Sequence, residues 1–376
     1  MKNDMLGLIF AENPEASMGE LTCHRALAAV PFGGRYRIID FLLSGMVNSS
    51  VINVGITTPC NYQSLTDHLG TGKDWDMDRK NNGLFILPPK DTGEGGGEVR
   101  GGVDIINGVR HYLSKSRQEY AVVADCNTIC NMNYDRVLKF HLEHEADITL
   151  IYHKEEKLSP NELKRQILLE VDEEDRVQDM HVYPAKQKTD LSYMHMFVVR
   201  KELLMDLVDD AVAHGKHSIS KDIFLTNLHR LKICAYAYQG CQLKVDDVKS
   251  FFDANLQLLN RETREELFGL NTNMPIYTKV KDTVPTKYGK NAEVSNSIVA
   301  DGCVIEGTVK NSVLFRGVHI GKGASVENCI IMQNSEIMDN CMMANVIFDK
   351  EVVLRNGKKL IGQDTYPMVI GKGTVI

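Results

Sequence analysis

The chain has 376 residues, of which 43% are hydrophobic and 25% are charged, with a formal net charge of −7. This composition is typical of a globular protein with room for two domains, and the acidic balance argues against a broad nucleic-acid surface. No apolar run approaches the roughly 20 residues that a membrane helix needs. Nine cysteines without tight pairing favour reduced thiols, so we expect a cytoplasmic protein without nucleic-acid or membrane partners.

Short apolar runs alternate with helical patterns through the first part of the chain. Buried strands are predicted at residues 5–10, 52–57, 120–124 and 147–152, and a helix with one apolar face at residues 134–145. Continuous apolar strands separated by helices indicate an α/β fold with a mainly parallel sheet covered on both faces. Because such sheets bind ligands beyond the carboxyl ends of their strands, we look for functional residues in the loops that follow them.

Two local patterns suggest ligand sites but have simpler explanations. Residues 91–98 are glycine-rich, yet no apolar strand leads into them and no Gly-Lys-Ser/Thr ending follows. We therefore expect a mobile surface loop there rather than a phosphate loop. Cys126 and Cys130 are four residues apart without a second cysteine pair nearby, so ordinary packing is favoured over a zinc site.

The C-terminal segment carries aliphatic residues at intervals of six, separated by glycine and asparagine. The spaced residues are Ile298, Val304, Leu314, Ile320, Val326, Ile331, Ile337 and Met343. A six-residue period with small turn residues indicates a hexapeptide parallel β-helix, in which each coil points aliphatic side chains inward. The chain is thus divided into an α/β domain at residues 1–245, a helical connector at 246–284 and a β-helix at 285–376.

Several blocks, in order along the chain, resemble one enzyme family. They lie at residues 31–41, 72–79 and 311–333, and together they resemble ADP-glucose pyrophosphorylases, also called glucose-1-phosphate adenylyltransferases, nearly end to end. The resemblance implies a Rossmann-like, GT-A-like nucleotidyltransferase domain, a left-handed β-helix and assembly as a tetramer. It also implies transfer of an adenylyl group from ATP to glucose 1-phosphate. That chemistry needs cations and Mg²⁺ around the phosphates.

The triphosphate-binding loop of that family is altered here. The family loop has the form Gly-Gly-x-Gly-Thr-Arg-Leu; its leading glycines fall at Glu12 and Asn13, its third glycine at Glu15 and its arginine at Ser17. Glycine allows the backbone to approach phosphate closely, whereas two carboxylates repel a polyanion. Alternatively, Glu12 and Glu15 point to solvent and another loop holds ATP.

Other charged positions of the family are also replaced. A lysine falls at Leu27, the metal-binding aspartate at Asn127 and the sugar-phosphate lysine at Tyr183. In an extended strand Asp125 would lie about 6–7 Å from Asn127, so it could replace the lost carboxylate only through a bulge. Asp222 matches the second metal carboxylate, which alone would bind Mg²⁺ weakly.

The expected sugar pocket carries two large rings. Tyr193 and His195 stand where the family has a small serine and glycine. Whether they line the pocket or pack in the core, we expect them to fill the space of a hexose.

The combined losses resemble the non-catalytic, GlgD-type regulatory subunits of this family. This interpretation implies no cofactor for the present chain, Mg²⁺ in a catalytic paralogue, and a heterotetramer of the two that makes ADP-glucose for glycogen biosynthesis. The alternative is an active adenylyltransferase with a rearranged site, in which Asp125 and Asp222 hold Mg²⁺ and Arg25 or Arg35 contacts phosphate.

Three arginines near the first conserved block are candidates for binding an effector. Arg25, Arg35 and Arg37 form a basic cluster, and the planar guanidinium group suits phosphate recognition. A phosphorylated metabolite is the expected ligand. Ion pairs with carboxylates such as Asp40 explain the same arginines equally well.

Overall fold

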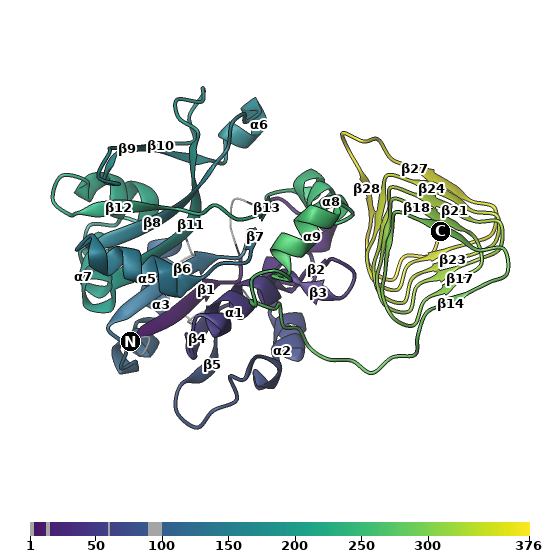
Figure 1. The fold of residues 1–376 in the computed structure, drawn as a ribbon, viewed down its shortest axis with the longest axis horizontal. Helices are drawn as coiled ribbons and strands as arrows, with labels where there is room; N and C mark the ends of the chain where they lie inside the picture. Colours follow the sequence, from purple (N-terminus) through teal and green to yellow (C-terminus); the bar gives the residue numbers. More distant parts are fainter. Residues whose placement is uncertain (1–3, 13–15, 59–60, 89–99) are drawn as a thin grey trace.

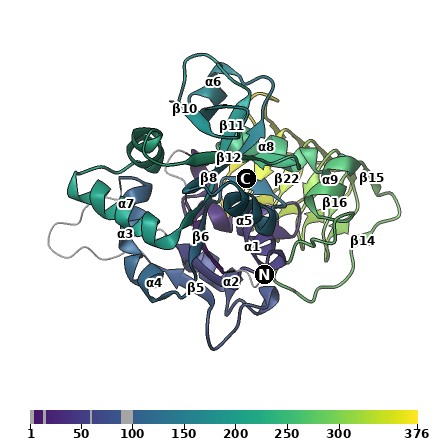
Figure 2. The same ribbon diagram turned by 60° about the vertical axis from the view of Figure 1, so that its left-hand side comes forward.

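The computed structural model describes residues 4–12, 16–58, 61–88 and 100–376. Figure 1 shows an α/β domain on one side and a β-helix with a triangular cross-section on the other. The two parts are joined by helices α8 (Val248–Gln257) and α9 (Arg261–Leu267) and an extended segment (Figures 1 and 2). The glycine-rich residues 91–98 lie outside the described ranges.

Four strands of the α/β domain run parallel, as their buried apolar sequences predict. They are β6 (Tyr120–Asp125), β1 (Met5–Phe10), β4 (Asn53–Thr57) and β5 (Gly83–Leu87), in that spatial order. All residues of β1 and β4 are buried, because helices cover both faces of the sheet. The strands end at one edge, where the loops after β1 and β6 meet.

The other half of the sheet is mixed. The long strand β11 (Leu191–Arg200) runs antiparallel to both β6 and β8 (Ile148–Lys154), while β12 (Ile233–Ala237) runs parallel to β8. A hairpin of β9 (Ile167–Val171) and β10 (Val177–Val182) extends one edge. Strand β11 was not predicted from the sequence. It brings Tyr193 and His195 beside the end of β6.

Alternate residues of the central strands enter two hydrophobic cores on opposite faces of the sheet. On β1, Met5 and Ile9 belong to one core, whereas Leu6 and Leu8 belong to the other. The first core is covered mainly by α1 (Ile38–Asn48), α2 (Gln63–Leu69), α5 (Tyr134–Glu143), α8 (Val248–Gln257) and α9 (Arg261–Leu267). The second is covered by α3 (Gly102–Gly108), α4 (Arg110–Lys115), α7 (Lys201–Ala213) and the π-helix η4 (Ile219–Leu225).

Short elements complete this domain and position its loops. They are the 3-10 helices η1 (Gly19–Leu21), η2 (Leu27–Ala29) and η3 (Lys73–Trp75), the helix α6 (Pro160–Leu163), the hairpin β2 (Pro31–Phe32) and β3 (Tyr36–Arg37), and the pair β7 (Thr128–Cys130) and β13 (Gln242–Lys244).

The C-terminal part is a β-helix of three parallel sheets, as the six-residue spacing predicts, and it is left-handed, as the family resemblance implies. Its core includes Leu314, Ile320, Val326, Ile331 and Ile337. The first sheet contains β14 (Lys287–Tyr288), β17 (Val304–Ile305), β20 (His319–Ile320), β23 (Glu336–Ile337) and β26 (Val353–Leu354). The second contains β15 (Glu293–Ser295), β18 (Thr308–Lys310), β21 (Ser325–Glu327), β24 (Met342–Ala344) and β27 (Lys359–Ile361). The third contains β16 (Ile298–Val299), β19 (Val313–Leu314), β22 (Ile330–Ile331), β25 (Val346–Phe348) and β28 (Met368–Ile370).

One sheet of the β-helix continues the first core of the α/β domain. Val313, Phe315, Ile330 and Ile347 cluster with residues of α1 and α8 in a single buried apolar set. The two parts therefore share a hydrophobic interface. Among the described residues, no helix combines the length and apolar character needed to cross a membrane. Every cysteine in the described ranges is a free thiol.

Candidate functional site

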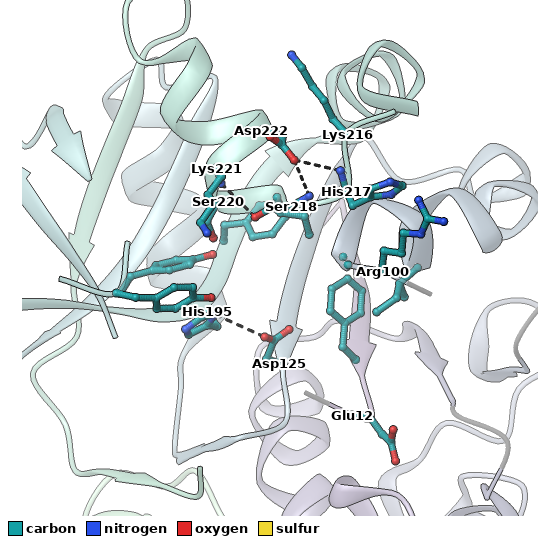
Figure 3. Close-up of a pocket in the computed structure, with 18 of the residues that line it drawn as sticks. Glu12, Arg100, Asp125, His195, Lys216, His217, Ser218, Ser220, Lys221 and Asp222 are labelled. Atoms are coloured by element: carbon teal, nitrogen blue, oxygen red, sulfur yellow. Dashed lines mark hydrogen bonds and ion pairs between the residues drawn. The ribbon is translucent and has the colours of Figure 1, made fainter. Parts of the chain in front are cut away.

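A cavity of about 490 Å³ opens at the carboxyl ends of β1 and β6. Phe10, Glu12 and Asp125 form its wall on the sheet side, and α3 and residues 215–222 form the opposite wall. Figure 3 shows this arrangement, with Glu12 below Asp125 and with Asp222 across the opening. This is the sheet edge at which α/β proteins bind their ligands.

Tyr193 and His195 line the cavity but do not fill it, which corrects the expectation drawn from their size. Tyr193 is 2% exposed and packs in the second core, and its ring lies 5.1 Å from that of His195. His195 Nδ1 lies 3.6 Å from Asp125 Oδ2. Burial, followed by the positive charge of Lys244, lowers the pKa of His195 to about 4. A neutral imidazole therefore faces Asp125 in an open pocket.

The backbone is strained at two of these lining residues. His195 has φ +54° and Tyr183 has φ +56°, a region that side chains other than glycine rarely adopt. The strand β11 is irregular between Tyr193 and Phe197, where its pairing with β8 shifts. Lys221 Nζ lies 5.1 Å from the centre of the Tyr183 ring. The tyrosine at the family's lysine position thus stacks against a lysine from the opposite wall.

Asp222 is held by backbone groups of its own loop. Its Oδ2 accepts hydrogen bonds from the backbone N–H groups of His217 (3.0 Å) and Ser218 (2.8 Å). These bonds order the turn that leads into η4. One oxygen of the carboxylate that was expected to bind metal is therefore held by backbone hydrogen bonds.

Asn127 lies in a turn rather than in an extended strand, so the geometry assumed for Asp125 and Asn127 was wrong. Strand β6 ends at Asp125, residues 126–127 form a turn, and β7 begins at Thr128. Asp125 consequently faces the cavity. Asn127, which is 5% exposed, donates from Nδ2 to Asp246 Oδ1 at 2.8 Å.

A lysine that the sequence analysis overlooked lies beside this turn. Lys244 pairs with Thr128 across β13 and β7, and its ammonium group donates to Gln166 Oε1 (2.6 Å) and Ser192 Oγ (3.0 Å). Glu155 Oε1 lies 3.8 Å from the same nitrogen. Nothing in the local sequence marks Lys244, because its partners come from three distant segments.

None of the described residues of the altered phosphate loop carries a positive charge. Glu12 follows β1, and burial raises the pKa of its carboxyl group. Ser17 is exposed and its backbone N–H donates to Asp246 O at 2.8 Å. Leu27, on η2, is 2% exposed in the first core. Asn13 and Glu15 lie outside the described residues.

The three candidate arginines have different environments. Arg25 is buried and donates from Nη1 and Nη2 to the two carboxylate oxygens of Asp349 in the β-helix. Arg37 donates from Nη1 to Ser64 O at 2.5 Å, and burial lowers its pKa to about 10. Arg35 is exposed, with its guanidinium 5.9 Å from the centre of the Tyr36 ring.

Further cations gather at the junction of the two domains. Arg316, on the β-helix, is 8% exposed, and neither its Nε nor its Nη2 has a hydrogen-bond partner among the described residues. Asp301 Oδ2 lies 3.8 Å from Nε of Arg316. Burial, followed by the charges of Arg37 and Arg25, lowers the pKa of Lys350 to about 7. Lys281 belongs to the same group, since burial and then Arg316 and Arg37 lower its pKa.

The residues around Asn127 do not fit a magnesium ion. Mg²⁺ needs several oxygens in octahedral geometry, including carboxylates. Asn127 is a neutral amide that donates to Asp246, and Thr128, the residue after it, pairs with Lys244, which is a cation. Within the described residues, one group of three side chains could hold a metal ion: Glu170, Asp179 and His181 on the β9–β10 hairpin.

Comparison with known proteins agrees with this architecture. The nucleotidyl transferase family model matches residues 18–261, and a GlmU-like C-terminal hexapeptide model matches residues 281–367. The chain is 35% identical to the glycogen biosynthesis protein GlgD of Bacillus subtilis over 99% of this chain and 97% of that protein. It belongs to the glucose-1-phosphate adenylyltransferase family. A GlgD of Geobacillus stearothermophilus is 41% identical, covering 87% of this chain and 84% of that protein, and a glucose-1-phosphate adenylyltransferase of the same organism is 33% identical with the same coverage.

Because the chain belongs to the adenylyltransferase family, its cavity can be compared with the family's active site. The structure brings Glu12, Asp125, Tyr183 and Asp222 to one cavity, whereas Leu27 and Asn127 do not line it. The arginines lie instead at the junction with the β-helix, so the chain has two separate regions of functional interest.

Proposed function

We propose that this chain is a regulatory subunit of glucose-1-phosphate adenylyltransferase in glycogen biosynthesis and makes little or no ADP-glucose by itself. It would join a catalytic paralogue in a heterotetramer and change that paralogue's activity. The names of the relatives support the pathway: two are glycogen biosynthesis proteins GlgD, and one is a glucose-1-phosphate adenylyltransferase.

The observation that carries the proposal is the chemistry of the cavity floor. Glu12, which follows β1, brings a partly buried carboxyl group into the lining of the cavity. The family's lysine position, Leu27, lies outside the cavity in the first core and supplies no charge. A triphosphate needs backbone N–H groups and cations at such a place. A carboxylate in a partly desolvated site instead repels it by several kcal/mol at an effective dielectric near ~20.

The alternative is an active adenylyltransferase with a rearranged site. Two observations favour it: the cavity keeps about 490 Å³ of space, and Asp125 faces into it. Against it, two backbone N–H groups already donate to Oδ2 of Asp222, so this carboxylate would have fewer lone pairs to offer a metal ion.

Calorimetric titration of ATP into the isolated chain separates the two functions. The regulatory proposal predicts no saturable, Mg²⁺-dependent binding at micromolar ATP. A micromolar dissociation constant that weakens on removal of Mg²⁺ would favour the active enzyme.

We further propose that a phosphorylated metabolite regulates the complex by binding at the domain junction. Arg316 supports this, because it is buried and its Nε and Nη2 have no hydrogen-bond partner among the described residues, with Asp301 Oδ2 3.8 Å from Nε. Lys281 and Lys350 lie near the same arginines. Arg35 and Arg37 reach this region from the α/β domain. Arg25 already binds Asp349, so we assign it to the interface between the domains rather than to the ligand.

A further inference from the structure

Lys244 is surrounded by oxygen atoms from three separate segments. Its ammonium group donates to Gln166, just before β9, and to Ser192, on β11, and it lies 3.8 Å from Glu155, just after β8. Its side chain is 17% exposed. An ammonium group with several close oxygens in a mostly buried place has an environment that resembles that of a bound metal cation.

The same segment makes three contacts with the turn that holds Asn127. Lys244 pairs with Thr128, the backbone N–H of Val245 donates to Asn127 O at 2.8 Å, and Asp246 accepts from Asn127 Nδ2 at 2.8 Å. An aspartate in place of Asn127 would face Asp246 with a like charge. Asparagine removes this repulsion, since its NH₂ group can donate to the carboxylate.

We propose that the ammonium group of Lys244 is a built-in cation that neutralises Glu155 and Asp246 beside Asn127 and thereby excludes a divalent metal ion from this place. The proposal rests on the proposed function, because it takes from the family resemblance that Asn127 marks a metal position. It goes further in naming the residue that replaces the ion.

The charges near Lys244 support this assignment. A divalent ion placed among the same oxygens would be repelled by the ammonium group of Lys244 a few ångströms away. The oxygens of Gln166, Ser192 and Glu155, which could serve as its ligands, already interact with that ammonium group. The field of Lys244 also reaches the cavity, where, after burial, it helps to keep His195 neutral. Lys244 and Asp246 also line a cleft of about 1,250 Å³ between the domains, so dissolved ions can approach from solvent.

Binding of Mn²⁺, measured by electron paramagnetic resonance on the full-length chain, tests the proposal. Asn127→Asp restores a carboxylate while Lys244 remains, and Asn127→Asp with Lys244→Met removes the ammonium group as well. We expect less than a threefold gain in Mn²⁺ affinity for the single variant and at least a tenfold gain for the double variant. Adding Glu155→Gln to the double variant should abolish most of that gain.

Matched controls separate charge from packing. Asn127→Asp with Lys244→Arg keeps the positive charge and should bind Mn²⁺ as weakly as Asn127→Asp alone. Asn127→Asp with Lys249→Met removes a partly exposed lysine that is paired with Asp253 on α8, and it should behave in the same way. Circular dichroism establishes that each variant is folded, and Lys244→Gln serves if Lys244→Met is not.

The proposal is overturned if Asn127→Asp alone gains as much affinity as the double variant, or if the folded double variant gains none. Neither result would bear on ADP-glucose synthesis, whose proposed loss is argued from Glu12 and Leu27 and not from Lys244. Conversely, efficient synthesis by the wild-type chain would refute the regulatory function whatever the Mn²⁺ data show.

Discussion

Arg25 and Asp349 join the two domains through a buried, two-point ion pair. Nη1 and Nη2 of Arg25 lie 2.8 and 2.7 Å from Oδ1 and Oδ2 of Asp349, and the two side chains are 3% and 1% exposed. Bidentate geometry of this kind is the strongest form of the arginine–carboxylate contact. The pair fixes how the β-helix sits against the α/β domain.

Replacing Arg25 by alanine should therefore lower the free energy of unfolding by about 3–5 kcal/mol, because Asp349 would be left buried without its partner. Urea denaturation followed by circular dichroism measures this loss. The double variant Arg25→Met with Asp349→Leu should lose less. Arg110→Ala, which breaks a pair that is about half exposed, should cost less than about 1 kcal/mol. Equal losses for Arg25→Ala and Arg110→Ala would contradict the structural role.

The junction cations make a separate prediction about ligand affinity. Arg316→Gln should weaken binding of a sugar bisphosphate by roughly 10- to 100-fold, the effect of losing one charge-assisted hydrogen bond of about 1.5–3 kcal/mol. Calorimetry on the chain with and without its catalytic partner measures it. Arg230→Gln, an exposed substitution next to β12 at the far side of the α/β domain, is the control. An unchanged affinity in Arg316→Gln would remove the junction as the effector site.

His141 should make the protein less stable in mild acid. It is 2% exposed, its Nδ1 lies 2.8 Å from Thr149 Oγ1, and burial lowers its pKa from 6.5 to about 4. The unfolded chain therefore binds a proton more readily than the folded chain. The free energy of unfolding should decrease from pH 6.5 to about pH 4, by up to about 3 kcal/mol from this residue. His141→Gln should flatten that decrease in denaturation curves recorded across this range, whereas an unchanged slope would exclude the residue as its source.

The β-helix has no space for a side chain at Gly307. A Cβ there would lie 2.4 Å from Ala324 O and 2.7 Å from Gly321 O, both backbone atoms of the next coil. Gly307→Ala should destabilise the protein by about 1–3 kcal/mol through overpacking. Gly108→Ala, where a Cβ meets no atom within 4 Å, is the matched control and should be neutral or slightly stabilising in the same thermal scan.

Local sequence signals were enough to predict much of the fold. The run at residues 5–10 is strand β1, the pattern at residues 134–145 is helix α5, and Leu314, Ile320 and Val326 are buried on successive strands of the β-helix. Each signal depends only on residues close together in the sequence. Apolar residues recur with a period of two in a strand, 3.6 in a helix and six in the β-helix.

The parts that the sequence did not predict depend on contacts between distant segments. Strand β11 could not be oriented, because its antiparallel pairing is decided by β6 and β8 rather than by its own residues. Lys244 and Arg316 acquire their environments from segments far along the chain. The turn at residues 126–127 was also not predicted, so the separation of Asp125 and Asn127 expected for an extended strand was wrong. Residue identity pointed to positions where the family's charged groups are replaced, but not to the contacts that the replacing residues make.

The most direct test of the account is the rate of ADP-glucose synthesis by the purified chain, alone and mixed with a catalytic glucose-1-phosphate adenylyltransferase from the same organism. ATP, glucose 1-phosphate and Mg²⁺ are supplied in both cases, and size-exclusion chromatography follows assembly. We predict no measurable synthesis by the chain alone, co-elution with the catalytic paralogue, and an altered rate or effector response in the mixture. Turnover by the lone chain at a rate comparable to that of the paralogue would contradict the central claim.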